Sequence, residues 1–224
     1  MKRTLPLLAC LLAFAMSSSA ANLLINGSFE TPIVPVGSYT LYPDGSAAIT
    51  GWQVVSNTGA NVAIVSGAFA QNGVSFPAQD GVQWLDLTGT SNTLNEGVQQ
   101  TVTTIPGQMY QLSYYVGNTT GGGIFGTTST VNVSINGTPT FFDTNSTVSP
   151  TTQNWEQFTH IFTATSGSTT LGFLNGDPPS DNNNGLDNIV LTEFNGTTPE
   201  PGTLILLGTG IVGLAGVLRR KMNI

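Results

Sequence analysis

Between residues 22 and 195 the chain consists of short runs in which apolar and polar residues alternate. In the clearest run, 110–116, every second residue is apolar, and a period of two is the spacing of side chains on one face of a β-strand. A helical period of 3.6 residues is not sustained in this region. The other runs are separated by Gly, Asn, Pro, Ser and Thr and include residues 131–135, 158–162, 171–173 and 189–191. This pattern predicts an all-β sandwich or barrel of about eight or more strands.

Turn and loop signals separate the predicted strands. Asn136-Gly137 follows the run 131–135, and an Asn-Gly pair in this position predicts a β-hairpin turn. Two longer stretches, 117–130 and 175–185, are rich in turn-forming residues and predict loops at an end of the sandwich. The second loop contains Asp177 and Asp181, for which we prefer a polar turn, because their spacing does not match an EF-hand calcium loop.

Charge is distributed unevenly along the chain. Residues 22–198 contain no Lys or Arg, whereas eleven of the twelve acidic residues fall there and only Glu200 lies outside. Because nucleic-acid backbones are bound through Lys and Arg, we do not expect DNA or RNA as a partner. The same stretch has no Cys and one His, which excludes disulfides, thiol chemistry and Cys/His zinc sites.

Residues 1–21 have the composition of a signal peptide. Lys2 and Arg3 precede an apolar run, and small residues follow it up to Ala21. Cleavage after Ala21 by signal peptidase would give a mature chain that begins at Asn22. A lipoprotein acylation site at Cys10 would place the cut inside the apolar run and is the less favoured interpretation.

An apolar segment, residues 203–218, follows the predicted β-sandwich domain (22–195) and a linker (196–202). As a helix it would measure about 24 Å against a hydrocarbon core of about 30 Å, so it predicts a marginal transmembrane helix. The basic tail 219–224 would remain in the cytoplasm and the acidic domain outside.

The order of these C-terminal segments resembles the PEP-CTERM sorting signal of Gram-negative bacteria. The residues that carry the resemblance are Pro199, Glu200 and Pro201 before the helix, and Arg219 and Arg220 after it. The resemblance implies export, transient membrane anchoring, and cleavage by an exosortase. It also implies a final location at the cell surface or in an extracellular matrix, often in association with exopolysaccharide.

Motifs spread over most of residues 22–195 resemble the galactose-binding-like jelly rolls of exported proteins. They are the segments 26–32, 51–52, 80–87 and 185–191, together with Trp155. The resemblance is to choice-of-anchor C proteins and their plant cell-wall relatives, and more distantly to carbohydrate-binding modules of polysaccharide hydrolases. It implies a jelly-roll β-sandwich, and it implies a structural Ca²⁺ bound by Glu30 and Asp187. Calcium prefers several carboxylate and carbonyl oxygens; the alternative is that both acids are solvated at strand ends.

A carbohydrate site needs aromatic faces beside amides or carboxylates. Trp84 and Asp86 alternate with Leu85 and Leu87, so both point outward if the leucines are core. By the same alternation Tyr115 is a third candidate ligand residue. For any one aromatic residue, including Trp52 and Trp155, packing in the core is the favoured interpretation.

An enzyme would need a catalytic set that the sequence does not assemble. A Ser-His-Asp triad could use only His160, in the middle of a predicted strand, and a glycosidase could draw on Asp80, Asp86, Glu96 or Glu156 without any known separation. We therefore predict a non-catalytic protein that binds extracellular polysaccharide or has a structural role in the matrix. The alternatives are a purely structural or adhesive component and, less favoured, a carboxylate-dependent glycoside hydrolase.

Overall fold

The computed structural model describes residues 21–194, except residues 92 and 180. The described residues contain thirteen strands and no helix long and apolar enough to cross a membrane. The strands are β1 (Tyr39–Pro43), β2 (Gln53–Val55), β3 (Asn61–Ser66), β4 (Ala70–Gln71), β5 (Val74–Ser75), β6 (Gln83–Asp86), β7 (Gly97–Thr103), β8 (Met109–Asn118), β9 (Ser129–Ile135), β10 (Thr138–Asn145), β11 (Asn154–Thr163), β12 (Ser168–Asn175) and β13 (Gly185–Glu193). Each alternating run becomes a strand, and Asn136-Gly137 forms the predicted turn between β9 and β10.

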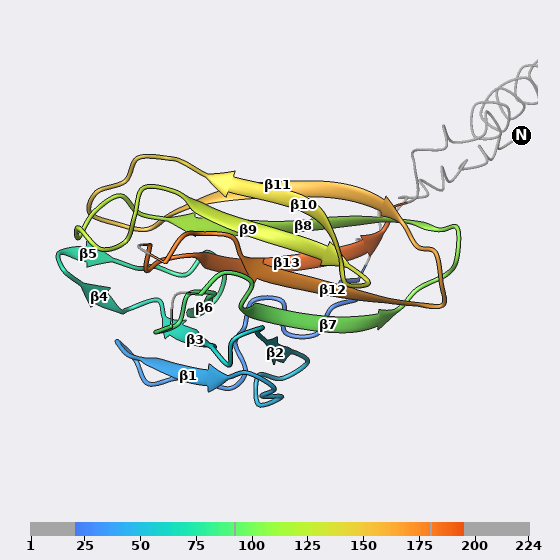
Figure 1. Cartoon of the computed structure of the whole chain (residues 1–224), viewed down its shortest axis with the longest axis horizontal. Coiled ribbons are helices and arrows are strands. Elements are labelled where there is room, and N and C mark those ends of the chain that lie inside the picture. The colour runs from blue at the N-terminus through green and yellow to red at the C-terminus, as the bar shows by residue number, and fades with distance from the viewer. Residues whose placement is uncertain (1–20, 92, 180, 195–224) are drawn as a thin grey trace, which may run out of the picture.

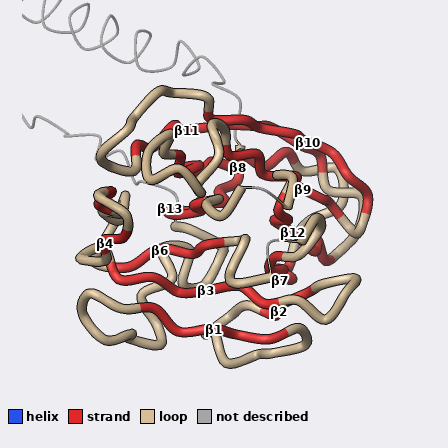
Figure 2. The backbone as a smooth tube through the Cα atoms, turned by 60° about the vertical axis from the view of Figure 1, so that its left-hand side comes forward, coloured by secondary structure: helices blue, strands red, loops and turns tan. Residues whose placement is uncertain are grey.

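Two antiparallel sheets face each other (Figure 1). Sheet A has six strands in the order β1-β3-β6-β13-β8-β11, and sheet B has five in the order β10-β9-β12-β7-β2. In Figure 2 sheet B lies to the right and sheet A to the left, with β4, one strand of the separate hairpin β4-β5, on the outer side of sheet A beside β6. The non-sequential strand order and the antiparallel pairing are those of a jelly-roll sandwich, which confirms the predicted fold class.

The main core lies between the two sheets. Along β8 the residues of the 110–116 run that were predicted to share one face are all fully buried: Tyr110, Leu112, Tyr114 and Val116. Trp52 is also in this core, where its ring packs on Phe29 and Phe173. Trp52 therefore has the packing role that we favoured for it.

A second, smaller apolar cluster covers the outer face of sheet A. All four residues of β6 are buried, because Leu85 packs in the main core while Trp84 packs on the opposite side. The cover comes from the β4-β5 region and from the loop 119–128. The cluster consists of Ala63, Val65, Val74, Phe76, Trp84 and Phe125.

The start of the described chain is bound to its last strand. Leu23 N–H donates to the Leu191 carbonyl at 2.9 Å, and the Asn22 side chain bonds both Ile189 O and Leu191 N. Asn22, the predicted first residue of the mature chain, is thus part of the sandwich. Residues 1–20 of the predicted signal peptide, the sorting motif and the predicted helix 203–218 lie outside the described residues.

Candidate functional site

A cavity of about 310 Å³ opens on the outer face of sheet A. We call it the outer-face pocket. Its floor follows from strand register: Tyr39 pairs with Val65 and Val65 with Trp84, while Ala63 pairs with Asp86, so these residues share one face of neighbouring strands. All five line the cavity.

The wall of the outer-face pocket is mostly aromatic. Phe76 is the centre of a ring network that reaches Trp84 at 6.1 Å, Phe69 at 5.7 Å and Phe125 at 5.0 Å between centroids. Trp84 donates its indole N–H to the Phe76 carbonyl, so this tryptophan presents an apolar surface to the cavity. Tyr39, packed edge-on against Phe69, is 43% exposed and forms part of the rim.

The polar side of the pocket contains one carboxylate among hydroxyl and amide groups. Asp86 accepts bonds from Thr88 N, Thr88 Oγ1 and Asn184 N, and all three go to Oδ1. Burial raises the pKa of Asp86 to about 6, against the lowering effect of those bonds. The remaining polar lining residues are Gln71, Thr90, Asn182 and Asn183. An aromatic wall opposite a few hydrogen-bonding groups is the composition expected of a site for a small polar ligand.

The structure brings together two of the three residues predicted to bind a ligand. Trp84 and Asp86 point to the same side of β6, as the alternation predicts, but they lie under a cover and are 2% and 9% exposed rather than open to solvent. Tyr115 does not line this pocket, and its role as a ligand residue stays a prediction. It lies half-buried on β8, opposite Asp187, and β13 separates β8 from β6.

The predicted calcium ligands Glu30 and Asp187 both bind one loop, residues 79–83. Glu30 Oε1 accepts from Val82 N and Gln83 N. Asp187 Oδ2 accepts from the main-chain N–H groups of residues 79 and 80, and its Oδ1 accepts from that of residue 188.

Three of the four carboxylate oxygens of Glu30 and Asp187 accept from main-chain N–H groups, which directs those lone pairs away from a cation. Among the described contacts, Glu30 Oε2 is the one oxygen of the pair without such a donor. Calcium at this pair stays a prediction. The contacts support a different role, in which two carboxylates fix the loop through charge-assisted hydrogen bonds.

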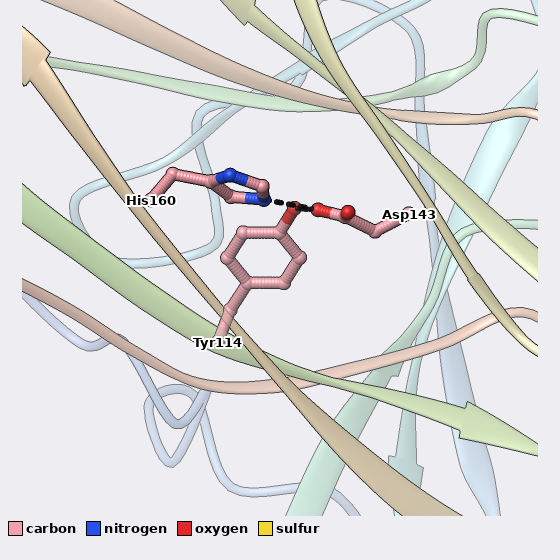
Figure 3. Close-up of polar contacts among 3 residues, drawn as sticks. All are labelled: Tyr114, Asp143 and His160. Atoms are coloured by element: carbon pink, nitrogen blue, oxygen red, sulfur yellow. Dashed lines mark hydrogen bonds and ion pairs between the residues drawn. The ribbon is translucent and has the colours of Figure 1, made fainter.

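A further polar cluster connects the sheets at their open edge (Figure 3). Asp143 on β10 accepts a hydrogen bond from the Tyr114 hydroxyl on β8 and contacts His160 Nε2 on β11 at 2.6 Å. Phe141 stacks on the His160 ring at 3.9 Å. Burial, and then the Asp143 carboxylate, raise the pKa of Tyr114 well above its usual value. In the described contacts no serine hydroxyl joins these three side chains, and their hydrogen bonds link β8 and β11 of sheet A to β10 of sheet B.

Sequence reasoning missed most of the pocket. Tyr39, Phe69, Phe76 and Phe125 were not singled out, because they come from four separate segments that meet only after the sheet has formed. Asp143 was missed for the same reason. The available signal was the apolar character of β3, where five consecutive residues are buried; a strand buried on both faces needs a cover on each side.

Comparison with family models gives two matches. Residues 22–191 match the family described as "Protein of unknown function (DUF642)", and residues 197–221 match the PEP-CTERM protein-sorting motif. A search of curated proteins finds no match.

Among solved structures, the Stig cyclase Fisc from Fischerella sp. TAU is 18% identical, with a TM-score of 0.56 over 79% of this chain and 98% of that chain. An apo cyclase from Fischerella sp. is 19% identical, with a TM-score of 0.56 over 80% of this chain and 99% of that one. A "Family 16 Carbohydrate Binding Module-2" is 20% identical over 77% of this chain and all of that chain, with a TM-score of 0.43. The two cyclases share the fold with this chain. Its sandwich domain, matched over residues 22–191, places the chain in the DUF642 family, and it carries a PEP-CTERM sorting motif after that domain.

Proposed function

We propose that this chain is an exported, non-catalytic protein of the cell surface or extracellular matrix and that its outer-face pocket binds a neutral carbohydrate. The sorting motif supports export and exosortase processing, with signal peptidase acting at residue 21. Kinship with the choice-of-anchor C group is part of the same proposal. The observation that carries it is the pairing of an aromatic wall with Asp86 and two asparagines around a cavity of about 310 Å³.

The size and charge of the pocket restrict the ligand. A volume of this order is at the lower end of the range for small-molecule sites, roughly 300–1,000 Å³, which suits one or two sugar rings of a longer chain. The domain has no Lys or Arg to attract an anion. A neutral glycan therefore fits better than an anionic one, since the ionised form of Asp86 accepts hydroxyl hydrogen bonds and repels carboxylates.

The contacts do not favour hydrolysis in this pocket. A glycosidase requires two carboxyl groups that flank the scissile bond. Of the acids considered from the sequence, Asp86 alone lines the cavity; Asp80, Glu96 and Glu156 do not. A hydrolase remains the weaker alternative, and reducing ends released from a polysaccharide panel, and abolished by Asp86→Asn, would establish it.

Affinity electrophoresis through gels that contain soluble neutral polysaccharides tests the proposal. We expect at least one gel to retard the protein, and Tyr39→Ala to weaken binding about fivefold, because one aromatic contact contributes roughly 1 kcal/mol. Asp86→Asn keeps the acceptor at Oδ1 and should also weaken binding. Phe142→Ala is the matched control, since that ring is 64% exposed on sheet B.

Binding that survives both pocket variants would refute the outer-face pocket as the site. No retardation by any polysaccharide would instead support the alternative, a structural or adhesive matrix component without a defined ligand.

A further inference from the structure

The loop 176–184, between β12 and β13, buries acidic side chains that the sequence predicts at a polar turn. The predicted loop is confirmed and contains turn hydrogen bonds such as Asn183 N to Asp181 Oδ1, but its acids are buried: Asp177 is 1% exposed and Asp181 is 3% exposed. The loop packs under the segment 126–130: Thr130 N–H donates to Asp177 Oδ1 at 2.7 Å, and Gly126 has a positive φ of 70° and lies against the Asp181 carboxylate. The two acids thus point into the protein.

No basic side chain compensates these charges. Residues 22–198 contain no Lys or Arg, and the one histidine, His160, contacts Asp143. Burial, and then the charge of Asp181, raise the pKa of Asp177 to about 8; burial is also the main cause that raises the pKa of Asp181 to about 7. The charge of Asp86 raises both pKa values further, so the ionised forms of Asp177 and Asp181 are destabilised unless a proton or a cation is bound.

Two buried oxygens in this loop lack a hydrogen-bond partner. They are Oδ2 of Asp177 and Oδ1 of Asn184, and both residues are at most 1% exposed. The two side chains lie close together, because Asp177 Oδ1 accepts from Thr130 N and Asn184 Nδ2 donates to Thr130 O. In addition, Asn184 Nδ2 and Asp177 N both donate to Asn175 Oδ1. Buried polar atoms are normally satisfied, so two unpartnered oxygens beside uncompensated carboxylates indicate a missing positive partner.

We propose that Asp177, Asp181 and Asn184 bind a divalent cation, of which Ca²⁺ is the best fit. Ca²⁺ accepts six to eight oxygen ligands in flexible geometry and combines carboxylates with amide and carbonyl oxygens and water. Mg²⁺ demands a stricter octahedron and is expected to bind more weakly. In the described residues no three acidic, His or Cys side chains are placed to hold an ion together. The site therefore relies on two carboxylates plus neutral oxygens.

The site differs from the Glu30–Asp187 pair in its donors. There main-chain N–H groups occupy three of the four carboxylate oxygens, whereas here the buried oxygens Asp177 Oδ2 and Asn184 Oδ1 have no donor. It also adjoins the outer-face pocket, because Asn183, next to Asn184, lines that cavity. The proposal does not require that the pocket bind a sugar.

Calorimetric titration of the chelator-stripped full chain with CaCl₂, and in parallel with MgCl₂, tests the site. The melting temperature is recorded with and without CaCl₂. The test variant is Asp177→Asn with Asp181→Asn, which keeps the acceptors Oδ1 for Thr130 and Asn183 while removing both charges. Glu30→Gln reports on the other pair, and Glu156→Gln, at an exposed position on β11, is the charge-matched control.

We expect the wild type to bind Ca²⁺ and to melt at a higher temperature in its presence. The double variant should bind one equivalent fewer, or at least tenfold more weakly, and lose that increase, while Glu30→Gln and Glu156→Gln retain both. A folded double variant that binds as many equivalents as the wild type with the same affinity would overturn the proposal. So would a wild type that binds no Ca²⁺ at millimolar concentration.

Discussion

Glu96, the residue immediately before β7, tests how burial affects the pKa of an acidic side chain in this domain. Its side chain is completely buried, with Oε1 accepting from Thr93 N at 2.8 Å and Oε2 from Ser91 Oγ at 2.9 Å. Burial, and to a smaller extent the charge of Asp86, raise the pKa of Glu96 from 4.5 to about 7 despite these bonds. The perturbation is Glu96→Gln, which removes the charge and retains the shape.

The sign and size of the effect follow from linkage. A folded-state pKa above the unfolded value means that the folded state binds the proton more tightly. The stabilising contribution of the protonated Glu96 is therefore fully present below pH 4.5 and is lost as the pH rises through about 7. A shift of this size corresponds to about 3 kcal/mol. Gln can keep both hydrogen bonds, because Ser91 Oγ can accept from the new amide. We expect Glu96→Gln to stabilise the fold by about 1–3 kcal/mol at pH 8 and to change it little at pH 4.

Urea unfolding at pH 4, 6 and 8, followed by tryptophan fluorescence, measures the effect, since all three tryptophans lie in the domain. Glu156→Gln, at an exposed position, is the control and should change stability by less than about 0.5 kcal/mol at every pH. An equal stability change for Glu96→Gln at pH 4 and pH 8, or a loss at pH 8, would refute the reasoning from burial.

Three further substitutions have defined expectations. Gly97→Ala would place a Cβ 1.9 Å from the Phe173 carbonyl oxygen on β12. We therefore expect the free energy of unfolding, measured in urea, to fall by at least about 2 kcal/mol. An unfolding midpoint equal to that of the wild type would contradict this close approach of the two backbones. Tyr114→Phe removes the hydroxyl that donates to Asp143 and should cost about 1–3 kcal/mol; a neutral result would mean that this link between the sheets contributes nothing. Asp187→Asn loses charge-assisted bonds to the 79–83 loop, so limited proteolysis should cut that loop faster than in the wild type, and an unchanged rate would show that the loop is held by other contacts.

The sequence predicts the strands of this fold more completely than its site. Strand patterns are local in the sequence, whereas the site joins segments that are distant in the sequence. Alternation over 110–116 identifies which β8 side chains are core, because the period of two is a local property. It also predicts that Trp84 and Asp86 share a side of β6. The cover over them includes Phe76, shortly before β6, and Phe125, from the loop between β8 and β9. Because Phe125 is distant from β6 in the sequence, no local pattern predicts this contact.

Because sequence patterns are local, the structure also adds contacts that the sequence analysis did not contain. Tyr115 was grouped with Trp84 from its face alone, but the position of β13 between β6 and β8 sets the distance between them. Glu30 and Asp187 are predicted from the sequence as calcium ligands, and only the structure shows that both accept hydrogen bonds from one loop. For Asp177 the sequence predicts a polar turn, and the structure shows that the 126–130 segment buries its side chain.

The place of β13 in sheet A has a consequence for the order in which the domain is made. This strand is the last of the described strands to be synthesised, yet it pairs with β6 on one side and β8 on the other, and it binds Leu23 at the start of the domain. Until residues 185–193 exist, β1-β3-β6 and β8-β11 are two separate half-sheets. Such non-local pairing also makes closure slow. Sheet A therefore cannot be completed before residues 185–193 are made, and the sorting motif at 197–221 follows within a few residues. Because closure is slow, the sorting motif is synthesised before the domain has finished closing.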